Sequence, residues 1–138
     1  MKPQKISENR TFCDAINAKS IIFDDLRDGF LLPTEETALR IARIIREERP
    51  EEIFTHWSGS FHPDHINAHL LVKQAVFIAS LPLEDESHPP FQTKLLFSEN
   101  WEDMSGFELS EFRSISDSSY DSWRLAIESH EFAHGQTS

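Results

Sequence analysis

Helix-forming stretches alternate with short apolar runs along this chain of 138 residues, and that alternation restricts the folds open to it. The apolar periodicity and the helix-end signals predict helices over residues 7–18, 34–49, 64–81 and 116–134, and strands over residues 21–23, 52–56 and 94–97. Strands that are joined through helices of this length pair in parallel with right-handed crossovers. The pattern therefore predicts an α/β fold, in which a mostly parallel sheet lies between two layers of helices.

The helix over residues 34–49 has the clearest end signals in the chain. Thr34 can cap its start, Pro50 stops it, and two acidic residues lie near its positive end. Arg43, Arg46 and Arg49 lie near its negative end, where cations complement the helix dipole. We expect all three arginines to serve this end of the helix.

Length and charge narrow the class of protein. A chain of 138 residues suits one domain, so we expect a single domain over residues 1–138. The one cysteine, Cys13, cannot form an internal disulfide, and residues 1–9 lack the apolar core of a signal peptide, which together favour a cytoplasmic location. The net charge of -11 argues against nucleic acid as a partner, and no apolar run is long enough to span a membrane.

Residues 54–69 read F-T-H-W-S-G-S-F-H-P-D-H-I-N-A-H and hold four of the seven histidines. Within this stretch His62, Asp64 and His65 lie where the strand over residues 52–56 gives way to a helix, and ligands of open α/β sheets bind at such carboxyl ends of strands. One imidazole could face a metal ion and the other a substrate, with the Asp fixing a tautomer. Asp28 follows the predicted strand over residues 21–23 and could face the same cleft.

The other histidines carry weaker signals. His65 and His69 are four residues apart, a spacing that can bind a metal ion but that also arises by chance. His56 and His88 are expected to have structural or solvated roles. Residues 130–134 read H-E-F-A-H, the H-E-x-x-H pattern of zinc proteases, but only four residues follow in which a third ligand could occur, so we interpret the pattern as incidental.

The combination of F-T-H-W with H-P-D-H at the head of a helix resembles the PIG-L/LmbE family of zinc-dependent N-deacetylases. Asp28, Gly29 and Leu31 are similar to the D-G-x-L motif of that family, and Glu8 is similar to its helix acid. The R-P-E-E-I run at residues 49–53 and the E-N-W-E-D-M run at residues 99–104 add to the likeness. The resemblance implies a Rossmann-like three-layer α/β/α fold.

The resemblance also implies site residues and a reaction. His65 matches the zinc ligand on the helix, His62 the histidine that stabilises the oxyanion, Asp64 the acid that orients that histidine, and Asp28 an acid that contacts the substrate. The implied chemistry is amide hydrolysis of N-acetylglucosamine-type conjugates, in which Zn²⁺ polarises the acetyl carbonyl and activates water.

The chain departs from the family at one motif. The other two zinc ligands and the general base of the family come from an A-H-P-D-D segment, which this sequence does not contain, and Lys5 stands where the family usually has a substrate-binding arginine. We therefore expect a fold that is incomplete at its N-terminus and a truncated or degenerate deacetylase. The alternatives are a non-catalytic binding remnant of the same fold and, less favoured, an H-E-x-x-H metalloprotease. Exposed strand edges would make a homo-oligomer plausible.

Overall fold

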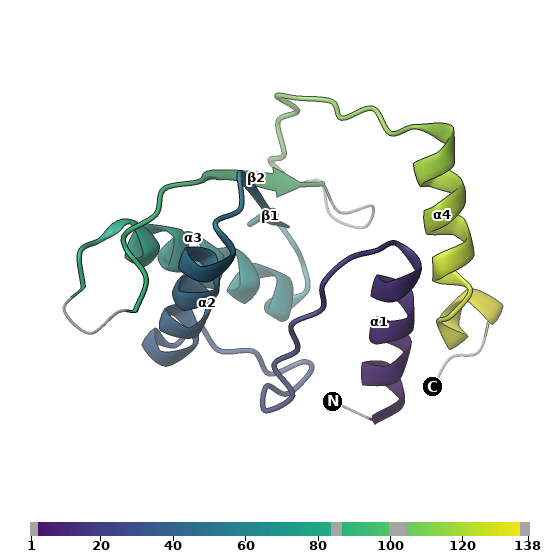
Figure 1. Cartoon of the computed structure of the whole chain (residues 1–138), viewed down its shortest axis with the longest axis horizontal. Helices are drawn as coiled ribbons and strands as arrows, with labels where there is room; N and C mark the ends of the chain where they lie inside the picture. The colour runs from purple at the N-terminus through teal and green to yellow at the C-terminus, as the bar shows by residue number, and fades with distance from the viewer. Residues whose placement is uncertain (1–2, 84–86, 100–104, 136–138) are drawn as a thin grey trace. The chain divides into compact units, whose positions relative to one another are not determined.

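A computed structural model of the chain describes residues 3–83, 87–99 and 105–135, and these residues fall into two compact units (Figure 1). One unit is Asp28–Glu108, and the other combines Met1–Arg27 with Leu109–Ser138. The expected single domain over residues 1–138 stays a prediction. No described helix is long and apolar enough to cross a membrane.

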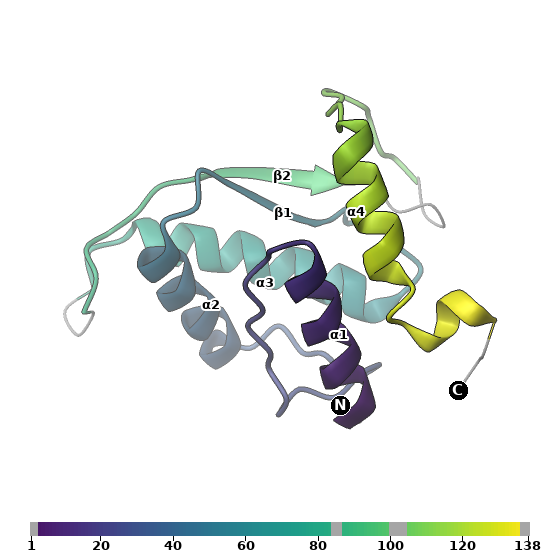
Figure 2. The same ribbon diagram turned by 45° about the vertical axis from the view of Figure 1, so that its right-hand side comes forward.

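The unit Asp28–Glu108 contains helices α2 (Glu35–Glu48) and α3 (Pro63–Ser80) and strands β1 (Glu52–His56) and β2 (Lys94–Ser98). The two strands pair in parallel with Ile53 opposite Leu95, and both helices lie on the same side of them (Figure 2). The predicted α/β class, the parallel pairing and these four elements are confirmed.

Small side chains hold α2 against α3. Ala42 and Ile45 of α2 and Ala75 and Ala79 of α3 form the buried core, and Ile53 of β1 packs against it. Alanine at three of these positions lets the helices approach closely, and close packing of such a core fixes the orientation of α3. The first turn of α3 carries the candidate site, so this packing also fixes the site.

Arg46 lies in the interior of this unit, where only 1% of its surface is exposed. Its guanidinium donates hydrogen bonds to the carbonyl oxygens of Ala79 (3.1 Å), Ile78 (3.2 Å), His88 (3.4 Å) and Leu81. The carbonyl oxygens in the last turn of a helix have no partner four residues further along it, and those of Ile78 and Ala79 lie in the last turn of α3. The side chain expected to serve the end of its own helix therefore also caps the neighbouring one.

The predicted strand over residues 21–23 is wrong, because the described residues form a sheet of two strands, β1 and β2. An apolar run becomes a strand only where a neighbouring strand supplies hydrogen bonds, and its composition does not tell whether one is present. Residues 21–23 belong to the other unit and have no regular secondary structure.

That other unit contains α1 (Pro3–Ala15), α4 (Asp117–Ile127) and the 3-10 helix η1 (Glu131–His134), and α1 packs against α4. Helix α1 starts and stops earlier than predicted, and Asn17, with a φ of 55°, lies just beyond its end. The single closing helix predicted over residues 116–134 is wrong beyond Ile127. Tertiary contacts of the turn explain the break, since Ser129 donates a hydrogen bond to the Glu8 carbonyl (3.5 Å) and His130 contacts the Glu8 carboxylate (3.5 Å).

Candidate functional site at the junction of β1 and α3

Three imidazole rings stack where β1 ends and α3 begins. The ring centroids of His56 and His65 are 4.1 Å apart with an interplanar angle of 4°, and those of His65 and His62 are 4.6 Å apart at 22°. His56 is the last residue of β1, His62 caps α3, and His65 lies in the first turn of that helix. The strand end and the helix start therefore bring together two predicted site residues and a third histidine.

The loop between His56 and His62 is held against residue 105. The Trp57 Nε1–H donates a hydrogen bond to the Ser105 carbonyl oxygen (2.9 Å). Gly59 lies so close to that same oxygen and to the Trp57 ring that a Cβ atom at position 59 would overlap with them. Glycine is therefore needed here for space, and the tight loop limits the ways in which the histidines can be arranged.

His62 is oriented by the backbone. It is the N-cap of α3, and its Nδ1 accepts a hydrogen bond from the Asp64 backbone N–H (3.2 Å), while Pro63 occupies the first turn, where its missing N–H costs little. Because a backbone N–H can only donate, the neutral His62 ring carries its proton on Nε2. The ring thus has an Nε2–H donor for a substrate oxygen.

Ser60 connects His62 and His65. Its Oγ accepts a hydrogen bond from the His62 backbone N–H (3.1 Å) and lies 3.2 Å from the His65 Nδ1. If the His65 Nδ1–H donates to Ser60, the Nε2 lone pair is the one that can bind a metal ion. Ser60 was not among the site residues predicted from the sequence, although its place in the loop before the H-P-D-H run could have indicated it.

His56 was assigned a structural or solvated role from the sequence, yet its ring stacks directly on His65. Burial lowers the pKa of His56 below its ordinary value, and the charges of His65 and His62 lower it further. The position of His56 at the carboxyl end of a strand was the signal that could have identified it.

Asp64 contacts the loop that contains Asp28. The Asp64 carboxylate accepts hydrogen bonds from the backbone N–H groups of Gly29 (2.6 Å) and Leu31 (3.0 Å). Asp28 is exposed in the turn just before Gly29. The structure therefore brings all four predicted site residues, Asp28, His62, Asp64 and His65, to one region of the unit. The Asp64 carboxylate binds the loop after Asp28, and it is the Asp64 backbone N–H that binds the His62 ring.

His69 contacts the end of β1 and a neighbouring aromatic ring. Its side chain is 5% exposed, its Nδ1–H donates to the His56 carbonyl oxygen (2.9 Å), and its ring packs on Phe97 at 4.7 Å between centroids. These contacts give His69 a structural role that supports the end of β1.

A metal site is not complete within the described residues, because they include no group of three His, Cys, Asp or Glu side chains that could hold an ion. Structural and catalytic zinc sites use at least three protein ligands. His65 supplies one suitable nitrogen, so these residues by themselves do not fit Zn²⁺.

The H-E-x-x-H pattern does not adopt the geometry that a zinc protease needs. His130 precedes η1, which contains His134, so the two histidines do not lie on one continuous α-helix, where residues four apart would share a face. The His134 Nε2–H donates to the Glu128 carbonyl oxygen (2.8 Å), and the His130 ring packs on Phe12. Each histidine has a local contact instead of a shared ligand.

Replacing these two histidines should change stability alone. We expect His130→Ala to cost about 1 kcal/mol, because it removes contacts with Phe12 and with the nearly buried Glu8 carboxylate, and His134→Ala to cost less. Burial raises the pKa of Glu8, but Lys5, a backbone hydrogen bond from Glu131 and the charge of His130 outweigh it and lower the pKa overall. Urea unfolding measures the loss of stability in both variants, and zinc titration measures whether they still bind zinc as the wild type does. Zinc binding lost specifically in the two variants would contradict the structural role.

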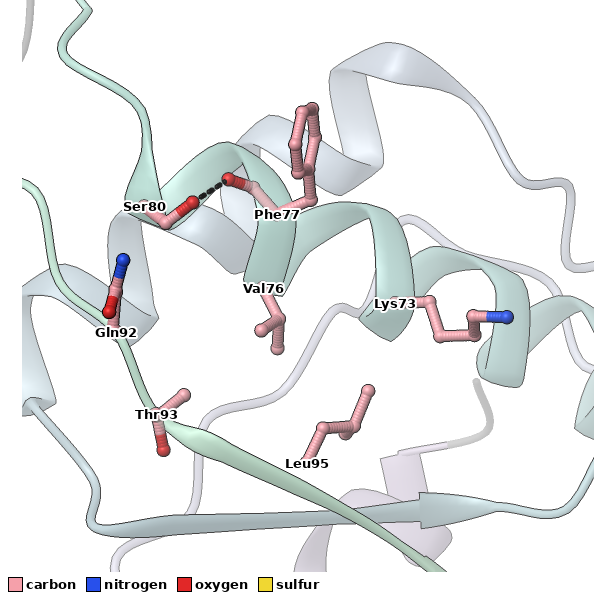
Figure 3. A pocket seen from close by; sticks show the side chains of 7 residues that line it. All are labelled: Lys73, Val76, Phe77, Ser80, Gln92, Thr93 and Leu95. Carbon is pink, nitrogen blue, oxygen red and sulfur yellow. Dashed lines mark hydrogen bonds between the residues drawn. The ribbon is translucent and has the colours of Figure 1, made fainter.

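A shallow groove lies elsewhere in the same unit, between the second half of α3 and the start of β2 (Figure 3). Val76 and Leu95 point toward one another across it, and Lys73 lies at one end. Its lining residues include no histidine or carboxylate, and Lys73 is the one titratable side chain among them, so they do not form a metal site and the candidate site remains at the histidines.

The described geometry defines an α/β protein with histidines gathered at a strand-to-helix junction. A family model described as PIG-L, GlcNAc-PI de-N-acetylase, matches residues 1–76, which is more than half of the chain. The chain therefore belongs to the PIG-L family, as the resemblance implied.

Two relatives have similar sequences. The chain is 42% identical over 64 residues to a 1D-myo-inositol 2-acetamido-2-deoxy-alpha-D-glucopyranoside deacetylase of Segniliparus rotundus, and 43% identical over 63 residues to a deacetylase of the same name from Thermomonospora curvata. These matches cover 45% and 44% of this chain but 20% and 21% of the relatives. The chain thus matches about a fifth of the length of each.

The fold is similar to that of a solved structure, the conserved protein TT1542 from Thermus thermophilus. The TM-score is 0.73 at 22% sequence identity, and the match covers 94% of this chain and 57% of that one. At this identity the likeness concerns the fold. Of the motifs that carried the resemblance, residues 100–104 of the E-N-W-E-D-M run lie outside the described residues.

Proposed function

We propose that this chain provides part of the active site of an N-deacetylase, an amide hydrolase that acts on N-acetylglucosamine-type conjugates. One observation carries the proposal: this chain belongs to the PIG-L family, and the turn with His62, Asp64 and His65 lies at the start of α3, after a parallel strand. The names of the relatives support the substrate class, since both describe deacetylases of an acetamido sugar joined to inositol.

Each residue has a chemical role under this proposal. The Nε2–H of His62 would donate a hydrogen bond to the oxygen of the tetrahedral intermediate as its negative charge develops. Asp28, which is exposed at the start of the loop held by Asp64, would accept hydrogen bonds from sugar hydroxyl groups. His65 would provide one metal ligand through Nε2, with Ser60 fixing its ring.

The remaining groups would come from an A-H-P-D-D segment, which the printed sequence does not contain. We propose that this segment, in a complete enzyme, supplies the general base and the other ligands of a zinc ion. This proposal includes the expectation that the chain is a truncated form of such a deacetylase. A carboxylate base must lie within hydrogen-bond reach of the attacking water, and a polarising metal ion needs several ligands to stay bound.

The chain alone should therefore have negligible activity. Purified as the 138-residue chain and assayed for acetate release from N-acetylglucosamine conjugates, it should not exceed the rate of a buffer control. One histidine ligand holds zinc weakly, and without a placed base there is little general catalysis. Turnover by the chain alone that disappears in His65→Ala would contradict this expectation.

The experiment that tests the proposed function supplies the missing segment. A polypeptide that carries A-H-P-D-D and its flanking strands, taken from one of the matched deacetylases, is co-expressed with or fused to the chain, and acetate release is measured. We expect activity only in the combined protein. A combined protein that folds, binds N-acetylglucosamine and releases no acetate would favour the second candidate, a binding protein without catalysis, which the incomplete metal-ligand set among the described residues supports.

A further inference from the structure

Two side chains of α3 hold the loop at residues 29–31 through three hydrogen bonds. The Asp64 carboxylate accepts from Gly29 N–H (2.6 Å) and Leu31 N–H (3.0 Å), and the Asn67 Nδ2–H donates to the Leu31 carbonyl oxygen (2.7 Å). Asp64 and Asn67 are three residues apart and therefore share one face of the helix. Together they bind both polar backbone groups of Leu31, although more than 30 residues separate helix and loop in the sequence.

Burial does little to hold this loop. Phe30 and Leu32, on either side of Leu31, are 65% and 66% exposed. Gly29 has a φ of 79° and no atom within 4 Å of where its Cβ would lie, so it needs glycine for its backbone conformation and makes no packing contact there. The hydrogen bonds to Asp64 and Asn67 therefore help to set the position of the loop.

Asp64 also acts on the histidine side of the site. Its backbone N–H donates to the His62 Nδ1, while its carboxylate binds the loop that follows Asp28. One residue thus links the imidazole that would face the reacting carbonyl with the loop that would face the sugar. A shift of the loop changes the distance between these two groups, and misplacement of about 1 Å is costly in such sites.

We propose that Asp64 and Asn67 are positioning residues, which clamp residues 29–31 and thereby place the Asp28 carboxylate for binding the hydroxyl groups of an N-acetylated sugar. This inference rests on the proposed function and adds to it how the sugar is located relative to His62. Asn67 acts only through the loop, because its described hydrogen bond is to the Leu31 carbonyl oxygen. Its effect should therefore fall on sugar binding.

The test uses the full chain without added metal and follows the backbone amides of residues 28–31 by NMR. In Asn67→Ala, hydrogen exchange at Gly29 and Leu31 should be roughly tenfold faster, the scale of one lost hydrogen bond, and in Asp64→Asn the increase should be larger because a charged acceptor of two bonds is weakened. Gln74→Ala, an exposed position on the same helix, is the matched control and should leave these amides unchanged. Exchange at the buried Ala75 reports whether each variant stays folded.

N-acetylglucosamine is then titrated into the same proteins. The amides of residues 28–31 should respond in the wild type, and the affinity should fall about tenfold in Asn67→Ala, remain unchanged in Gln74→Ala and recover in part in Asn67→Gln, which keeps the donor. Equal affinity in wild type and Asn67→Ala, despite a loosened loop, would reduce the clamp to a structural contact and overturn the inference. A wild-type loop that does not respond to the sugar would overturn it too, whereas the proposed function is decided separately by acetate release from the combined protein.

Discussion

His65→Ala should remove metal and activity together from the combined protein that carries A-H-P-D-D, whereas His62→Ala should keep the metal and slow turnover by roughly a hundredfold or more. The two rings stack on each other, but their Nδ1 atoms have different hydrogen-bond partners. His62 Nδ1 accepts a hydrogen bond from the Asp64 backbone N–H, which leaves the His62 Nε2–H for the developing oxyanion. The His65 Nδ1 lies against Ser60, which leaves the His65 Nε2 as the nitrogen that would bind the metal ion. Loss of a ligand and loss of a hydrogen-bond donor therefore have different signatures.

Zinc content and acetate release, measured on the same preparations, separate the two effects. His88→Ala is the control, because His88 is exposed and its ring contacts only the neighbouring Ser87 among the described hydrogen bonds. It should retain both zinc and turnover. If the combined protein binds one equivalent of zinc equally well with and without His65, the match of this turn to the deacetylase motif is wrong and the proposed function fails with it.

The elements that carry the site could be predicted from the sequence because their signals are local. Thr34 caps α2 as expected, with its side chain accepting a hydrogen bond from the Thr37 N–H (3.2 Å), and the change from a short apolar run to a helical period at Asp64 located the junction of β1 and α3. The gathering of His62, Asp64 and His65 followed from their spacing. Parallel pairing followed from the intervening helix.

The partners of those residues could not be predicted, because they are far away in the sequence. Nothing near Asp64 indicates that its carboxylate binds Gly29 and Leu31, and a charge count does not distinguish the buried Arg46 from the exposed Arg43. The same limit explains the wrong strand at residues 21–23 and the break after Ile127, which both depend on what neighbouring elements offer. Local propensity predicts elements, and tertiary contacts decide their ends and the orientation of polar side chains.

Arg46→Met should destabilise the unit Asp28–Glu108 by about 3 kcal/mol or more, which is a large fraction of the stability of a small protein. Methionine fills much of the same volume but donates no hydrogen bonds. The carbonyl oxygens of Ile78, Ala79 and Leu81 would then lose the guanidinium at the end of α3. Those of Ile78 and Ala79 keep the backbone N–H groups of Leu81 and Phe91, but a site that leaves only 1% of the Arg46 surface exposed would no longer hold a donor for the remaining lone pairs. The core between α2 and α3 would loosen next to these groups.

Urea unfolding followed by circular dichroism measures the effect, and Arg43→Met on the exposed face of α2 provides a matched control with the same change of charge and volume. The control should cost less than about 1 kcal/mol, as exposed positions usually do. Arg46→Lys should fall in between, because an ammonium group keeps the charge but cannot reach several carbonyl oxygens with the planar fork of a guanidinium. If Arg46→Met and Arg43→Met unfold at the same urea concentration, the hydrogen bonds to the end of α3 contribute no net stability, and α2 and α3 are held together by their alanine and isoleucine contacts alone.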